Sequence, residues 1–188
     1  MKTLRSLVVL GLLFAVPFAG KAQTGDKVGG IRFGYHTANM FKDGEKMPLS
    51  SNLDNFYIGF SRDNKIAPMF RLGTGLEYFK NGFKIDDDNK LVLHTISIPV
   101  NLKIKLGPVF ALTGVGANFK VSEKIFLAGS SANPPDDSKS KFFDVPFYLG
   151  AGATILFISV EARYHWGLLE ANDGYNNRYF QVGAALSF

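Results

Sequence analysis

The sequence predicts an all-β fold: an eight-stranded antiparallel up-and-down transmembrane β-barrel. Three observations favour it. Apolar and polar residues alternate with a period of two through most of the chain, which indicates strands with two different faces. The connections between these strands are alternately long and short, and the last strand ends on an aromatic residue, Phe188. An even number of such strands, with short turns on one side and long loops on the other, is typical of outer-membrane barrels.

Residues 1–22 are expected to be a cleaved secretory signal peptide that precedes a barrel domain at residues 23–188. Two basic residues come before an apolar run at residues 7–18, and the small-x-small sequence at residues 20–22 marks the cleavage site. The run is about 12 residues long, whereas a membrane-spanning helix needs about 20. An uncleaved membrane anchor is therefore the less favoured alternative.

The composition argues against several classes of function. Three of the 21 basic residues lie in the predicted signal peptide, so the remaining chain has 18 basic and 16 acidic residues and a net charge of about +2. This near balance gives no basis for nucleic-acid binding. With no cysteine, the chain has neither disulfides nor thiolate metal sites. Its 18 Phe and 20 Gly fit aromatic girdles and closely packed strands.

The first four strands are expected at about residues 28–41, 55–61, 69–80 and 92–106. Their apolar faces carry, strand by strand, Ile31, Phe33 and Tyr35; Phe56, Ile58 and Phe60; Phe70, Leu72 and Leu76; and Ile96, Ile98 and Val100. Their opposite faces carry Arg32 and His36; Tyr57 and Gly59; Arg71 and Glu77; and Ser97, Asn101 and Lys103. His94 interrupts the apolar face of the fourth strand.

The last four strands are expected at about residues 109–120, 144–154, 158–167 and 178–188. Their apolar faces carry Val109, Ala111 and Val115; Val145, Phe147 and Leu149; Ile158, Val160 and Tyr164; and Phe180, Val182 and Leu186. Their opposite faces carry Gly114 and Asn118; Tyr148 and Gly150; Glu161, Arg163 and His165; and Tyr179, Gln181 and Gly183.

The connections between the strands predict which end of the barrel faces which compartment. Long polar connections are expected at residues 42–54, 81–90, 121–143 and 170–177, and short ones at residues 62–68, 107–108 and 155–157. The connection at 155–157 has the weakest signal, because it contains no Gly, Pro or Asn. Short turns lie on the periplasmic side of such barrels, so both termini are expected there.

The apolar face is expected to contact lipid and the polar face to line the lumen. Burying residues such as Arg71, Glu161 and Arg163 in the dry core of a soluble barrel would be very costly. Glycines share the charged face, as expected where a narrow lumen needs small residues beside long ones. The apolar face is almost free of charge, and each lipid-facing charge at mid-bilayer would cost about 2–4 kcal/mol. A membrane barrel is therefore favoured over a soluble one.

Several segments resemble the outer-membrane β-barrel domain family of Bacteroidetes-type bacteria, also called PorT-like. They are residues 94–103 with the Ile98-Pro99 dipeptide, residues 150–152, residues 161–168 with the run Glu161-x-Arg163-Tyr164, the start at residues 28–31, and the terminal Phe188. The resemblance covers residues 23–188. It implies a barrel fold, but most members of the family have no assigned activity, and a few take part in protein secretion.

Five charged residues on the predicted lumen face form the candidate site: Arg71, Glu77, Lys103, Glu161 and Arg163. Their signs alternate, so they are expected to pair across neighbouring strands and fill the lumen with an ion-pair network. An ion path is the alternative. The interior of an eight-stranded barrel is just wide enough for side chains, whereas water-filled porins have about 16 strands or more, so the plug is favoured.

Other motifs give weaker signals. The three histidines, His36, His94 and His165, are too scattered to indicate a metal site. The acidic segments at residues 86–89 and 134–137 lack the ligand spacing of a calcium loop and are interpreted as solvated loop tips. No serine is placed by the sequence to serve His94 in a lipid-hydrolysing site, so catalysis is the remote alternative.

The sequence thus predicts a small non-enzymatic barrel of the bacterial outer membrane, without cofactor or metal, acting structurally or through its external loops. An accessory subunit of a secretion or transport complex is the alternative, and a lipid-modifying enzyme the remote one. The expected partners are outer-membrane lipid and, during insertion, the barrel-assembly machinery. A monomer is expected.

Overall fold

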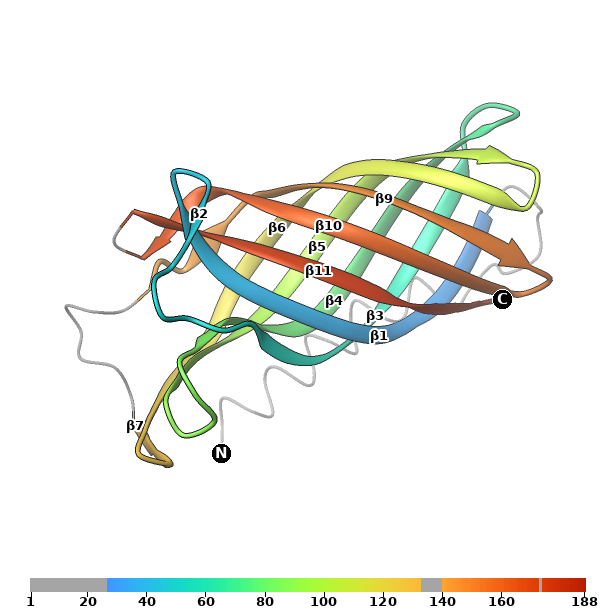
Figure 1. The fold of residues 1–188 in the computed structure, drawn as a ribbon. Coiled ribbons are helices and arrows are strands. Elements are labelled where there is room, and N and C mark those ends of the chain that lie inside the picture. Colours follow the sequence, from blue (N-terminus) through green and yellow to red (C-terminus); the bar gives the residue numbers. More distant parts are fainter. Residues whose placement is uncertain (1–26, 133–139, 173) are drawn as a thin grey trace.

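A computed structural model describes residues 27–132, 140–172 and 174–188, and these residues form a closed β-barrel (Figure 1). The wall consists of eight long strands: β1 (Lys27–Lys42), β3 (Leu53–Lys65), β4 (Phe70–Lys84), β5 (Lys90–Leu106), β6 (Val109–Leu127), β9 (Pro146–Ile155), β10 (Ile158–Asn172) and β11 (Tyr175–Ser187). Three short strands lie at one end: β2 (Glu45–Lys46), β7 (Ser130–Ala132) and β8 (Phe143–Asp144). The predicted signal peptide and the acidic segment at 134–137 lie outside the described residues.

Every strand of the wall pairs antiparallel with its neighbours in chain order, and β11 closes the ring on β1. The closing register runs from Gly30 opposite Ser187 to Phe41 opposite Asn176. Closure matters because an open sheet edge would leave backbone groups without hydrogen-bond partners in hydrocarbon. The predicted fold class, an eight-stranded antiparallel transmembrane barrel, is confirmed. In the described part of the chain, no helix has the length and apolar character to cross a membrane.

The two faces of the wall are the ones that the alternation predicts. On β5, Ser97 is 3% exposed and points into the lumen, whereas its neighbour Ile98 is 44% exposed on the outer surface. The same contrast holds around the ring: large apolar residues cover the outside, and polar residues line the inside. A water-soluble barrel would have the reverse arrangement. This outer surface is suited to lipid.

The two ends of the barrel differ. At the turn end, on the right of Figure 1, lie the connections at residues 66–69, 107–108 and 156–157 together with Phe188, which exchanges backbone hydrogen bonds with Gly29. At the loop end, on the left, lie β2, β7 and the remaining connections. The connection predicted at residues 155–157, which has the weakest signal in the sequence, is present as a short turn between β9 and β10. Leu156 occupies its left-handed position, with φ 55°, although that conformation favours glycine.

Several predicted boundaries were wrong, chiefly at the loop end. The stretches 81–90, 121–143 and 170–177 were predicted as loops, but β4, β5, β6, β10 and β11 extend into them. The strands continue because their inward positions carry apolar residues: Leu91, Leu93 and Ala171 pack together there above the polar lumen. The predicted second strand, 55–61, was too short at both ends: β3 runs from Leu53 to Lys65, and its polar last residues stay paired with β4.

Candidate functional site

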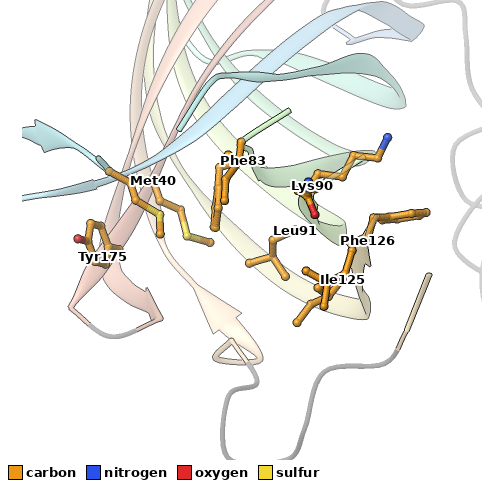
Figure 2. Close-up of a pocket in the computed structure, with 11 residues that line it drawn as sticks. Met40, Phe83, Lys90, Leu91, Ile125, Phe126 and Tyr175 are labelled. Carbon is orange, nitrogen blue, oxygen red and sulfur yellow. The ribbon is translucent and has the colours of Figure 1, made fainter. Parts of the chain in front are cut away.

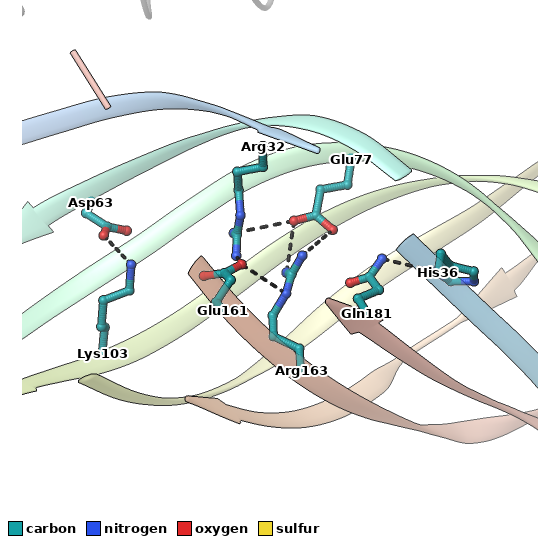
Figure 3. Close-up of polar contacts among 8 residues, drawn as sticks. All are labelled: Arg32, His36, Asp63, Glu77, Lys103, Glu161, Arg163 and Gln181. Carbon is teal, nitrogen blue, oxygen red and sulfur yellow. Dashed lines mark hydrogen bonds and ion pairs between the residues drawn. The ribbon is translucent and has the colours of Figure 1, made fainter. Parts of the chain in front are cut away.

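The lumen contains a compact ionic cluster of four residues from three strands, here called the lumen cluster: Arg32, Glu77, Glu161 and Arg163. Arg163 of β10 donates to both carboxylate oxygens of Glu77 on β4, with Nη1–Oε1 and Nη2–Oε2 distances of 2.9 and 3.2 Å. Arg32 of β1 lies 3.4 Å from Glu77 Oε1 and also pairs with Glu161. The Nε atom of Arg163 lies 3.3 Å from Glu161 Oε1. Figure 3 shows the four side chains meeting across the lumen.

The lumen cluster is neutral overall and almost completely buried. Two guanidinium groups face two carboxylates, and the four side chains are between 1% and 4% exposed. Isolated charges at this depth would be very costly, so each must be neutralised by its neighbours. The two-pronged contact between Arg163 and Glu77 is the geometry in which guanidinium and carboxylate pair most strongly. The cluster therefore closes the middle of the barrel with side chains.

The structure brings together three of the five residues that the sequence singled out, Glu77, Glu161 and Arg163. Lys103 is separate and pairs with Asp63, with Nζ 2.5 Å from Oδ2 (Figure 3). Arg71 lies opposite Lys103 in the register of β4 and β5, so it faces a like charge, and its buried Nη1 makes no hydrogen bond to any described residue. Six strand residues, about 20 Å, separate Arg71 from Glu77 along β4.

Sequence reasoning placed Arg32 on the inward face but missed it as a member of the cluster. Its partner Glu161 lies on β10, and β11 stands between β10 and β1 in the ring. A contact across the lumen depends on the stagger of the strands, and alternation along one strand carries no information on stagger. The balance of charge gives no signal either, because Arg71, Lys103 and Arg163 already offer three inward cations to Glu77 and Glu161.

A layer of rings and amides fills the lumen on the loop-end side of the cluster. Gln181 Nε2 and Asn81 Oδ1 each lie 3.2 Å from one ring nitrogen of His36. His36 stacks on Phe79, with ring centroids 4.7 Å apart. His165 stacks between Tyr148 and Tyr179 in the same way. The two histidines are thus packing elements of the plug, and no group of three His, Cys, Asp or Glu in the described part of the chain is placed to hold a metal ion.

An apolar pocket of about 260 Å³ opens at the loop end, above this plug. Figure 2 shows its lining, which includes Met40, Phe83, Leu91, Ile125, Phe126 and Tyr175. Met40 and Leu91 of this lining also belong to a buried apolar cluster with Leu93 and Ala171. Lys90 stands at its rim, with Nζ 5.1 Å from the centre of the Phe126 ring. The pocket has room for a small apolar group. Sequence reasoning does not find it, because most of its lining lies in segments that the sequence predicts as loops.

The acidic segment at residues 86–89 forms a turn stabilised by its own groups. The Asp86 carboxylate accepts hydrogen bonds from the backbone N–H groups of Asp88 and Asn89, at 2.9 and 2.7 Å, and from the Asn89 side chain. The Asn89 side chain, and then the two backbone donors, lower the pKa of Asp86. Asp87 pairs with Lys84 at 3.0 Å. These carboxylates are used within the loop itself.

His94 lies on the outer wall near the loop end, as its position on the apolar face predicts. Its Nδ1 is 2.6 Å from the hydroxyl oxygen of Tyr78 on β4. Sequence reasoning found no serine for His94, but the register of β5 and β6 places Ser122 directly opposite it. Among the described residues no hydrogen bond joins Ser122 to His94, and the imidazole is engaged by the tyrosine instead.

Comparisons with known proteins identify the fold alone. No family model and no curated protein matches the sequence. Among solved structures, the barrel is similar to the attachment invasion locus protein Ail of Yersinia pestis in complex with the heparin analogue sucrose octasulfate, with 16% identity, a TM-score of 0.51, and coverage of 87% of this chain and 99% of that one. It is also similar to Neisserial surface protein A, with 13% identity, a TM-score of 0.57 and coverage of 85% and 97%.

Replacing Arg163 by methionine is expected to destabilise the barrel strongly. The change leaves two buried carboxylates with one guanidinium, and breaking a buried ion pair from one side costs about 3–5 kcal/mol. The measurement is urea unfolding in phospholipid vesicles, followed by the fluorescence of Trp166, the one tryptophan of the chain.

The matched control is Lys141→Met, which removes an exposed pair with Glu170. Exposed pairs contribute about 1 kcal/mol or less. Equal losses in the two variants would show that the lumen cluster does not hold the barrel together.

Proposed function

We propose that this protein is a small, non-enzymatic barrel of the bacterial outer membrane that acts as a structural element or through its loop end. The observation that carries the proposal is the continuous plug of the lumen cluster and the ring layer above it. A lumen closed in this way leaves two surfaces for function, the lipid-facing wall and the loop end. The fold shared with Ail and Neisserial surface protein A supports the location in the outer membrane.

We further propose that the chain is a PorT-like member of the outer-membrane barrel family. The support comes from its motifs and from their places in the fold. Pro99 of the Ile98-Pro99 dipeptide is buried on the lumen side, and Glu161 and Arg163 of the Glu-x-Arg-Tyr run belong to the lumen cluster. The motifs thus correspond to positions that fill a narrow barrel. Insertion by the barrel-assembly machinery, as a monomer, follows from this assignment.

Planar-bilayer recording tests the plug. The purified protein is expected to show little or no steady conductance, because charged and aromatic side chains occupy the lumen at successive levels. A water-filled porin recorded in the same bilayers gives the reference for an open channel, and insertion is verified by protease protection. Stable openings of porin size would contradict the proposed closed lumen.

Labelling with a membrane-impermeant maleimide tests the orientation. The chain has no cysteine, so Lys46→Cys at the loop end and Ile66→Cys at the turn end each introduce a single reactive thiol. In intact cells, label is expected at residue 46 and absent at residue 66 until the outer membrane is permeabilised. The opposite pattern would place the loop end and both termini on the other sides of the membrane.

A further inference from the structure

Basic residues gather on the outer wall near the loop end, over β4, β5 and β6. Lys80 of β4 lies opposite His94 of β5, and His94 lies opposite Ser122 of β6. Lys124 follows two residues after Ser122, on the same face. Lys80 is thus directly across from His94, and Lys124 lies on the neighbouring strand two residues beyond the partner of His94. These residues, Lys80, His94, Ser122 and Lys124, are called the rim patch below.

The lysines of the rim patch differ from most other cations near the loop end, although Lys46 of β2 likewise has no ion pair or ring contact with a described residue. Lys84, Lys120 and Lys141 each pair with a carboxylate. Lys42, Lys90 and Arg178 each lie over an aromatic ring. In the described part of the chain, neither Lys80 nor Lys124 has an ion pair or a ring beneath it. The rim patch therefore carries positive charge that the protein itself does not neutralise.

The rim patch lies at the height where lipid headgroups are expected. Directly below it, towards the turn end, the outer wall carries Tyr78 and Phe119, and the ring of Phe143 packs on Phe119 at 5.2 Å. Below these rings the wall is aliphatic, with Ile98 and Val100 exposed on β5. Aromatic side chains of membrane proteins gather at the boundary between hydrocarbon and headgroups. A cation just beyond this boundary faces the phosphate layer of the bilayer.

We propose that the rim patch binds the phosphate group of an anionic lipid in the leaflet at the loop end. The two ammonium groups provide the charge, and the Ser122 hydroxyl provides a neutral donor. In the tautomer in which the Tyr78 hydroxyl donates to His94 Nδ1, the imidazole proton is on Nε2, which is then a further donor. The acyl chains of the lipid would lie along the apolar wall below. This inference rests on the proposed location in a membrane.

The wall next to the rim patch, over β3 and β1, is not equivalent, although β3 is the immediate neighbour of β4. On β3 and β1, Asp54 and Tyr35 occupy the outer surface near the loop end, and the Tyr35 hydroxyl donates to the Asp54 carboxylate at 2.5 Å. An acidic group at this position repels a phosphate. Anionic lipid is therefore expected at one sector of the wall rather than as an even ring around it.

Native mass spectrometry of the detergent-solubilised full-length protein with diphosphoryl lipid A tests the proposal. The double variant Lys80→Gln/Lys124→Gln is expected to bind this lipid about 30-fold more weakly, since each lysine near a headgroup contributes about a factor of five in affinity. The control Lys27→Gln/Lys46→Gln makes the same change of charge at two exposed positions outside the rim patch and is expected to bind normally.

Each result of the binding experiment either supports or overturns the rim patch as a site for a lipid phosphate. Equal binding by both double variants, or equal binding of dephosphorylated lipid A by the wild-type protein, would overturn the rim patch as a phosphate site. Displacement of the lipid by an equimolar amount of inorganic phosphate would overturn a lipid as its source. In parallel, the protein is reconstituted into vesicles, and its insertion is followed by Trp166 fluorescence. Failure to insert would contradict the proposed membrane location. Insertion without selective binding of the phosphorylated lipid would contradict the rim patch alone.

Discussion

The pairing of two arginines with two glutamates in the lumen is the interaction on which the rest of the structure depends. The wall of the barrel meets hydrocarbon, where neither a charged side chain nor a free backbone group finds a partner. Closing β11 on β1 satisfies the backbone, and turning every second residue inward removes polar side chains from the lipid. The inward charges then have to neutralise one another. Glu77 and Glu161 do so because Arg32 and Arg163 reach them from β1 and β10.

This arrangement limits what the molecule can do. The glycines of the inward faces make room for the cluster and the rings: a Cβ placed on Gly183 would lie 2.6 Å from the Tyr57 hydroxyl and 2.3 Å from the carbonyl oxygen of Phe33. The narrow lumen is thus filled to contact, and transport through it would require the plug to rearrange. Function is shifted to the surfaces that remain, the lipid-facing wall with its rim patch and the loop end with its apolar pocket.

Much of the barrel was predictable because lipid imposes a strict period of two. The strands, their inward and outward faces and even the turn at 155–157 follow from that period alone. The prediction became less accurate where the wall leaves the membrane. There the inward positions become apolar, as at Leu91 and Ile125, so the alternation of polar inside and apolar outside is lost, and the sequence predicts loops in place of the ends of the strands.

The sequence predicted the kind of site, an ion-pair network in the lumen, but not all of the residues that form it. Charge on the inward face indicated ion pairs, and Glu77, Glu161 and Arg163 do meet. The contact of Arg32 with Glu161 crosses a strand and depends on stagger, and the separation of Arg71 from Glu77 depends on their heights along the barrel axis. Neither quantity is encoded in the alternation of a single strand. The rim patch was missed for the same reason, since its members come from three strands and meet through register.

The central claim is that the apolar face of the wall meets hydrocarbon and the charged face lines the lumen. Nitroxide scanning along β5 tests it most directly: single cysteines are introduced from Ile96 to Asn101 in the cysteine-free chain, spin-labelled, and reconstituted in vesicles. The account predicts that collision with dissolved oxygen peaks at residues 96, 98 and 100 and falls at 97, 99 and 101. Peaks at the odd-numbered positions, or no period of two, would contradict it.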